Sequence, residues 1–170
     1  MRATLPGTWA LVLTLSLEYL AACGSPSKAI DACSLLTKEE LEAAVGWQVT
    51  EITPGTIPGM DGSCGFFGKI DQKSVPALAK AIVEQNASIG YWQRDRSFKT
   101  SAEMAQALSN QQGLDGPPAP VEDLGVPAVR MNMFGVTSIH MSTPRLLVVV
   151  TTPKAEATKT IAAKVLARLS

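Results

Sequence analysis

The first clear pattern of polar and apolar positions is a helix start. Thr37 is followed three residues later by Glu40, the spacing of a capping box, and apolar residues flank the pair. This pattern predicts a helix from Lys38 to Val45, which Gly46 would end in a left-handed conformation.

Two further segments have helical spacing. Thr100 and Glu103 repeat the capping pattern, and the apolar stripe that follows predicts a helix extending to Gly113. Near the C-terminus, residues 153–169 carry apolar side chains on one side of a predicted helix: Ile161, Val165, Leu166 and Leu169.

Strand-like patterns fill most of the remaining chain. Alternation over residues 47–52 and an apolar stretch over residues 64–70 predict two strands, separated by a loop rich in Pro and Gly. Residues 74–85 alternate like a strand but are rich in Ala like a helix. We interpret them as a strand because one would pair economically with residues 64–70.

The C-terminal third predicts three strands before the last helix, over residues 126–133, 136–141 and 146–151. The run from Leu146 to Val150 is apolar throughout, which is typical of a strand buried on both faces, so we place it at the centre of the sheet. The sequence therefore predicts an α+β fold, with a mostly antiparallel sheet and helices packed on it.

The N-terminal segment predicts export and lipid attachment. Residues 1–22 have a basic start, a short apolar run and small residues before Cys23, which Gly24 follows, and this resembles a bacterial lipobox. The resemblance implies a diacylglycerol thioether on Cys23 and a cell-membrane location on the extracytoplasmic face, with palmitate-type acyl chains. A plain secretory signal is the alternative. Residues 23–32 would form a tether to a single domain, residues 33–170.

Charge composition bears on the class of partner. The chain has 15 Lys and Arg against 15 Asp and Glu, so it offers nucleic acid no basic field.

With Cys23 lipidated, Cys33 and Cys64 form an even pair in an oxidising compartment, which favours a disulfide over two free thiols or a redox pair.

Several short motifs resemble those of small actinobacterial, mycobacterial-type lipoproteins of unknown function. They are the run from Asp31 to Thr37 with Glu40, Leu41 and Gly46, the later Gly62, Ser63 and Cys64, and the run from Val121 to Gly125 with Ala128. The resemblance implies a compact α+β sandwich similar to PsbP-like proteins, with Cys33 joined to Cys64. It implies no further site residue.

Catalytic signatures are absent from the sequence, and His140 is its only histidine. Soft thioethers with an imidazole suit Cu(I), and a two-residue turn at Phe134 and Gly135 would place Met131, Met133 and His140 on one face, with Met141 near in sequence. We favour the alternative that these methionines fill the core, so we predict no metal and no cofactor.

A second candidate is Tyr91, Trp92, Arg94 and Arg96, because aromatic faces beside guanidinium groups suit a glycan, a lipid headgroup or a partner protein. Such a cluster more often anchors a loop on the core. We expect a non-catalytic binding or accessory module of the cell envelope, with an envelope protein, glycan or lipid as partner. The alternatives are a carrier or sensor that takes an apolar or lipid ligand between the sheet and the helices, and an enzyme of unrecognised class.

Overall fold

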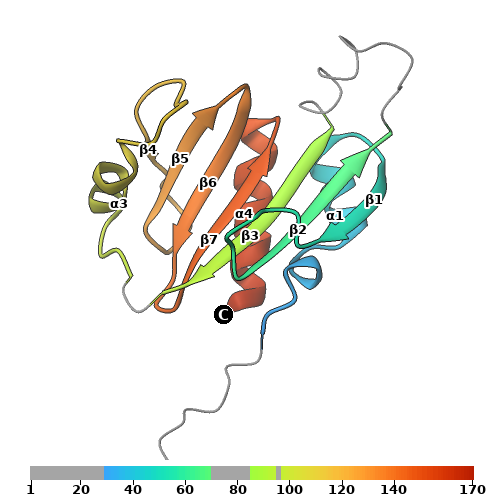
Figure 1. Ribbon diagram of the computed structural model, residues 1–170, viewed down its shortest axis with the longest axis horizontal. Coiled ribbons are helices and arrows are strands. Elements are labelled where there is room, and N and C mark those ends of the chain that lie inside the picture. The colour runs from blue at the N-terminus through green and yellow to red at the C-terminus, as the bar shows by residue number, and fades with distance from the viewer. Residues whose placement is uncertain (1–28, 70–84, 95–96) are drawn as a thin grey trace, which may run out of the picture.

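The computed structural model describes residues 29–69, 85–94 and 97–170 (Figure 1). The described elements follow one another as η1 (Ala32–Leu35), α1 (Lys38–Val45), β1 (Val49–Pro54), β2 (Gly62–Gly68), β3 (Asn86–Gln93), α3 (Ser101–Leu108), β4 (Ala119–Pro120), β5 (Ala128–Met133), β6 (Val136–Ser142), β7 (Leu146–Thr152) and α4 (Ala155–Leu169).

The seven strands of the described residues form one antiparallel sheet in the order β1-β2-β3-β7-β6-β5-β4. Helices pack on this sheet, so the predicted α+β class with a mostly antiparallel sheet is confirmed. β7 is the fourth of the seven strands, which confirms the central position expected from its apolar run.

The two faces of the sheet have different covers. The first, which we call the helical face, includes Ile139, Met141 and Val148 and packs against α1, α4 and η1 in the main core. Figure 1 shows α1 and α4 behind the sheet. The opposite side, which we call the loop face, includes Val129, Met131 and Leu147 and packs against α3 in a smaller cluster.

The helix caps follow the sequence pattern closely. The N–H of Glu40 donates to Thr37 Oγ1 at 3.3 Å, the N–H of Thr37 donates to Glu40 Oε2 at 3.0 Å, and Gly46 ends α1 at φ 77°. The helix α3 begins as expected after Thr100 but ends at Leu108 rather than Gly113. Beyond it, the N–H of Gln111 turns back to donate to the Leu108 carbonyl, so the helix does not continue.

The strand beside β2 was not predicted where it occurs. Antiparallel pairing with β2 is made by β3, from Asn86 to Gln93, and not by the expected strand over residues 74–85. Of those residues, 74–84 lie outside the described part of the chain. None of the helices in the described ranges combines the length and apolar character needed to cross a bilayer.

A disulfide joins Cys33 to Cys64, with an S–S distance of 2.08 Å and Cα atoms 5.0 Å apart. The predicted pairing is thereby confirmed. The bond connects η1 to β2 across 31 positions of sequence, and Cys64 is fully buried in the main core.

Candidate functional site

An open pocket of about 440 Å³ lies where the loop between β1 and β2 meets the residues that precede and begin η1. Its volume is within the range of small-ligand sites. Asp31, Asp61 and Ser63 are its acidic and hydroxyl side chains. Its apolar side chains are Ile30, Ala32, Pro54, Ile57, Pro58 and Met60.

Glycines in the sheet allow this loop to lie close against the loop face. A Cβ atom at Gly90 would overlap Met60 Sδ, and one at Gly65 would lie 2.8 Å from Thr56 Cγ2. The loop is also tied down by a hydrogen bond from Trp92 Nε1 to the Gly59 carbonyl at 2.7 Å. Glycine at both strand positions is therefore a condition for this wall of the pocket.

The opposite wall, residues 30–35, is held at three points. Tyr91 donates its hydroxyl to the Ile30 carbonyl at 2.7 Å, Cys33 is bonded to Cys64, and Arg168 Nη1 donates to the Leu35 carbonyl at 2.8 Å. Ala32 is only 3% exposed. The last residues of the predicted tether, 30–32, thus belong to the folded domain.

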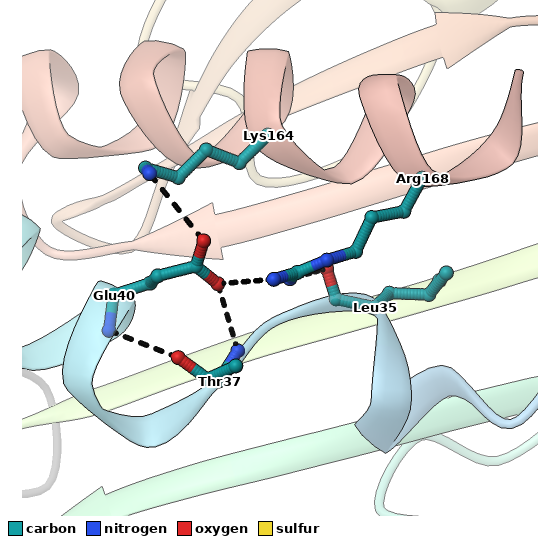
Figure 2. Close-up of polar contacts among 5 residues, drawn as sticks. All are labelled: Leu35, Thr37, Glu40, Lys164 and Arg168. Atoms are coloured by element: carbon teal, nitrogen blue, oxygen red, sulfur yellow. Dashed lines mark hydrogen bonds and ion pairs between the residues drawn. The ribbon is translucent and has the colours of Figure 1, made fainter.

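Figure 2 shows how Arg168 is kept in place to do this. Its guanidinium lies between the Leu35 carbonyl and Glu40, whose Oε2 is 2.8 Å from Nη2, while Lys164 is 3.4 Å from Oε1. The backbone N–H of Thr37 and then Arg168 lower the pKa of Glu40 from 4.5 to about 2. The carboxylate is consequently ionised at neutral pH and fixes the arginine that holds the wall.

The polar groups of the pocket hold its own walls. Asp31 Oδ1 accepts the N–H of Cys33 at 2.9 Å, Asp61 Oδ2 accepts the N–H of Gln93, and Ser63 Oγ accepts the N–H of Ile57 at 3.0 Å. A side chain engaged in this way can orient a ligand, but none of these contacts activates a nucleophile. The geometry is suited to binding an apolar group.

The candidate formed by Tyr91, Trp92, Arg94 and Arg96 is not a single surface cluster. Tyr91 and Trp92 are neighbours in β3 and point to opposite faces of the sheet, because side chains alternate along a strand. Tyr91 is 1% exposed in the main core, and Arg94 lies over the Phe98 ring at 5.7 Å. Arg96 lies outside the described residues.

The candidate soft-metal residues do share one face. The turn at Phe134 and Gly135 has the expected two residues, and its register places Met131, Met133 and His140 on the loop face. Met131 is 1% exposed and packs in the α3 cluster, as expected of a core methionine. Within the described ranges, no group of three or more His, Cys, Asp or Glu is arranged to hold a metal.

His140 is 9% exposed, and within the described residues its side chain forms one hydrogen bond, between Nε2 and Ser138 Oγ at 3.2 Å. Burial and then Arg94 lower its pKa from 6.5 to about 4, so the imidazole is neutral at pH 7. Its Nδ1 is buried, and no group in the described part of the chain bonds to it. A serine–histidine pair needs a third group to orient the ring, and Ser138 also donates to the Met131 carbonyl at 3.4 Å.

A second, smaller hollow of about 330 Å³ lies between the start of α3 and residues 121–127. Its acidic residues include Asp123, which forms an ion pair with Lys159 at 3.6 Å. The side chains of this hollow add no nucleophile and base in contact, so the first pocket is the better candidate site.

Sequence reasoning did not find that pocket. Its Pro- and Gly-rich loop was recognised only as a loop, and the strand carrying Gly90 was not predicted. The detectable signal was small residues at 62, 65 and 90, which mark places where a backbone or side chain approaches a strand closely.

Comparison with known proteins finds no relative of this chain. No protein-family model matches it, and neither the curated proteins nor the solved structures include a match. The lipoprotein resemblance and the PsbP-like arrangement therefore stay predictions, and the α+β antiparallel sheet with its disulfide is the extent of the classification.

Proposed function

We propose that this chain is a non-catalytic binding or accessory module of the bacterial cell envelope, held on the extracytoplasmic face of the cell membrane by lipid on Cys23. The lipobox-like sequence before Cys23 supports the anchor, and a disulfide suits an oxidising compartment. The family of small actinobacterial lipoproteins is the proposed context.

One observation carries the binding role: the pocket of about 440 Å³ is formed in part by Ile30, Asp31 and Ala32, where the described chain begins. An extended chain spans at most about 3.6 Å per residue, so Cys23 lies within about 25 Å of Ile30. A lipid on Cys23 would therefore keep this pocket close to the membrane surface.

A carrier or sensor of an apolar ligand is the second candidate, and the apolar side chains of the pocket favour it. The carrier was expected to hold its ligand between the sheet and the helices. The pocket lies instead at the ends of β1 and β2, and residues of the main core fill the space between the sheet and α4.

The anchor can be tested by feeding cells an alkyne-tagged fatty acid and separating their membranes. The wild-type chain should be labelled and sediment with membranes, whereas Cys23→Ala should lose both properties. Ser25→Ala, two residues away, is the matched control and should keep both. Labelling of the Cys23→Ala chain, or an unlabelled wild-type chain, would contradict the proposal.

Binding can be tested by native mass spectrometry of the tagged protein extracted from its own membrane. A ligand in the pocket should add a defined mass to the wild-type chain, and Ile57→Asp should remove that mass because it places a charge among apolar side chains. Ile52→Asp, an exposed residue of β1 that does not line the pocket, should retain it. An added mass that is equal in both variants would place binding elsewhere.

A further inference from the structure

We infer that the pocket takes an acyl chain of a bilayer lipid, an assignment that rests on the proposed anchoring of the domain through Cys23. The ligand is a fatty acyl chain, and the source is the membrane beside the tether, not the acyl groups on Cys23.

The chemistry of the walls supports an apolar occupant. Ile30, Ile57 and Met60 present aliphatic surface, and all three are partly exposed in the protein as it stands. Covering such surface with a hydrocarbon chain is favourable and needs no hydrogen-bond partner. The polar groups of the pocket already accept backbone N–H groups of the walls, so an acyl chain would leave no new donor unpaired.

Position supports the membrane as the source. Ile30 and Asp31 line the pocket, and six residues separate Ile30 from Cys23, so the opening cannot be far from the lipid surface. Asp31 and Asp61 are exposed and line the same pocket. Their carboxylates complement the ammonium group of a phosphatidylethanolamine headgroup better than a purely anionic one.

Trp92 provides a reporter at the site, because its Nε1 is bonded to the carbonyl of Gly59, a lining residue. We would place the anchored Trp47→Phe protein in vesicles of phosphatidylethanolamine with brominated acyl chains, which quench tryptophan on contact. Trp92 emission should fall. Ile57→Asp in the same background should weaken the quenching about ten-fold or more, and Ile52→Asp should leave it unchanged.

The two proposals fail in different ways. If the protein floats with the vesicles but Trp92 is not quenched, or is quenched equally with Ile57→Asp, the anchor stands and the acyl-chain site is wrong. Occupation by the anchor's own unbrominated chains would give this same unquenched result, and so contradict the bilayer source. If the protein does not float, the anchor is wrong. Free brominated stearic acid, titrated without vesicles, must then quench Trp92 and lose this effect with Ile57→Asp, or the pocket assignment is also wrong.

Discussion

The helical and loop faces of the same sheet differ in what covers them and in how many apolar residues they bury. The helical face is covered by α1, α4 and η1, and its contacts form one continuous apolar core. The loop face is covered by a short helix and a loop, and its apolar cluster contains fewer buried residues. Because the helical face buries more apolar residues, we expect it to contribute more of the stability, whereas the loop face carries the close-lying loop that forms one wall of the pocket.

The largest expected effect tests whether the two cores differ in stability. Ile161 of α4 and Met104 of α3 are each 0% exposed, one on each face. Ile161→Ala should lower the free energy of unfolding by about 4 kcal/mol, and Met104→Ala by about 2 kcal/mol. The smaller loss is expected because α3 is short and lies against an edge of the sheet, where it can shift to fill the cavity.

Urea unfolding of both variants would measure this difference. The wild-type protein and a conservative Ile161→Val change serve as references, and the latter should cost about 1 kcal/mol. Equal losses for the two alanine variants, or a larger loss for Met104→Ala, would show that the α3 cluster is as rigid as the main core.

The second prediction concerns the bond that joins the pocket wall to the sheet. Replacing both Cys33 and Cys64 with Ala should cost about 3 kcal/mol, because the unfolded chain is no longer cross-linked. Hydrogen exchange at the amides of residues 33–35 should increase more than at Met104, since only the former segment loses a direct attachment.

The reduced wild-type protein is the control for this variant. Its urea midpoint should match that of the double-alanine protein, since both lack the cross-link. A loss well below 1 kcal/mol would contradict the cross-linking argument, whereas unchanged exchange at residues 33–35 would mean that the attachments from Tyr91 and Arg168 fix this segment without the disulfide.

Local signals explain which parts of the fold could be predicted. The start of α1 depends on Thr37 and Glu40, which are close in sequence, and the central place of β7 depends on an apolar run that needs cover on both faces. The turn at Phe134 and Gly135 follows from alternation in the strands on either side. Each of these features is determined by neighbours within a few residues.

The missed features depend on contacts between distant segments. β3 alternates Ala87, Ile89 and Tyr91 toward the helical face, but Trp92 on the other face made the segment resemble an aromatic cluster. In the structure, Trp92 Nε1 donates a hydrogen bond to the carbonyl of Gly59, which is 33 residues away in sequence. The pocket likewise exists only because the loop between β1 and β2 meets glycines of β2 and β3, which no local pattern specifies.

The third prediction uses pH to separate the faces. The pKa of His140 is about 4 in the folded protein, chiefly through burial and then through Arg94, against 6.5 for the free side chain. The unfolded chain therefore binds the proton first as pH falls. The free energy of unfolding should therefore decrease by about 3 kcal/mol as the pH falls from 6.5 to 4. Above pH 6.5 the histidine is neutral in both states, and this loss is absent.

His140→Gln should remove this pH dependence from the loop face, whatever its own effect on stability at pH 7. Urea midpoints at several pH values would measure how stability depends on pH, and NMR of the imidazole protons would give the pKa of His140 in the folded protein directly. Arg94→Ala should raise that pKa, since it removes a nearby positive charge. An imidazole that titrates near 6.5 in the folded protein would contradict the burial argument.

The smallest effect is expected at the ion pair of Glu40 with Arg168 on the helical face, which we call the clasp, and it lies in a lower pH window. The pKa of Glu40 is lowered from 4.5 to about 2, first by the N–H of Thr37 and then by Arg168, so its contribution is present above pH 4.5 and lost as pH falls toward 2. Glu40→Gln should remove that contribution and leave the decline between pH 6.5 and pH 4 intact. Glu39→Gln, at the exposed neighbouring position, is the matched control and should change stability less at pH 6. If Glu40→Gln instead altered the higher window, the clasp and the buried histidine would be coupled, and the two faces could not be treated as independent.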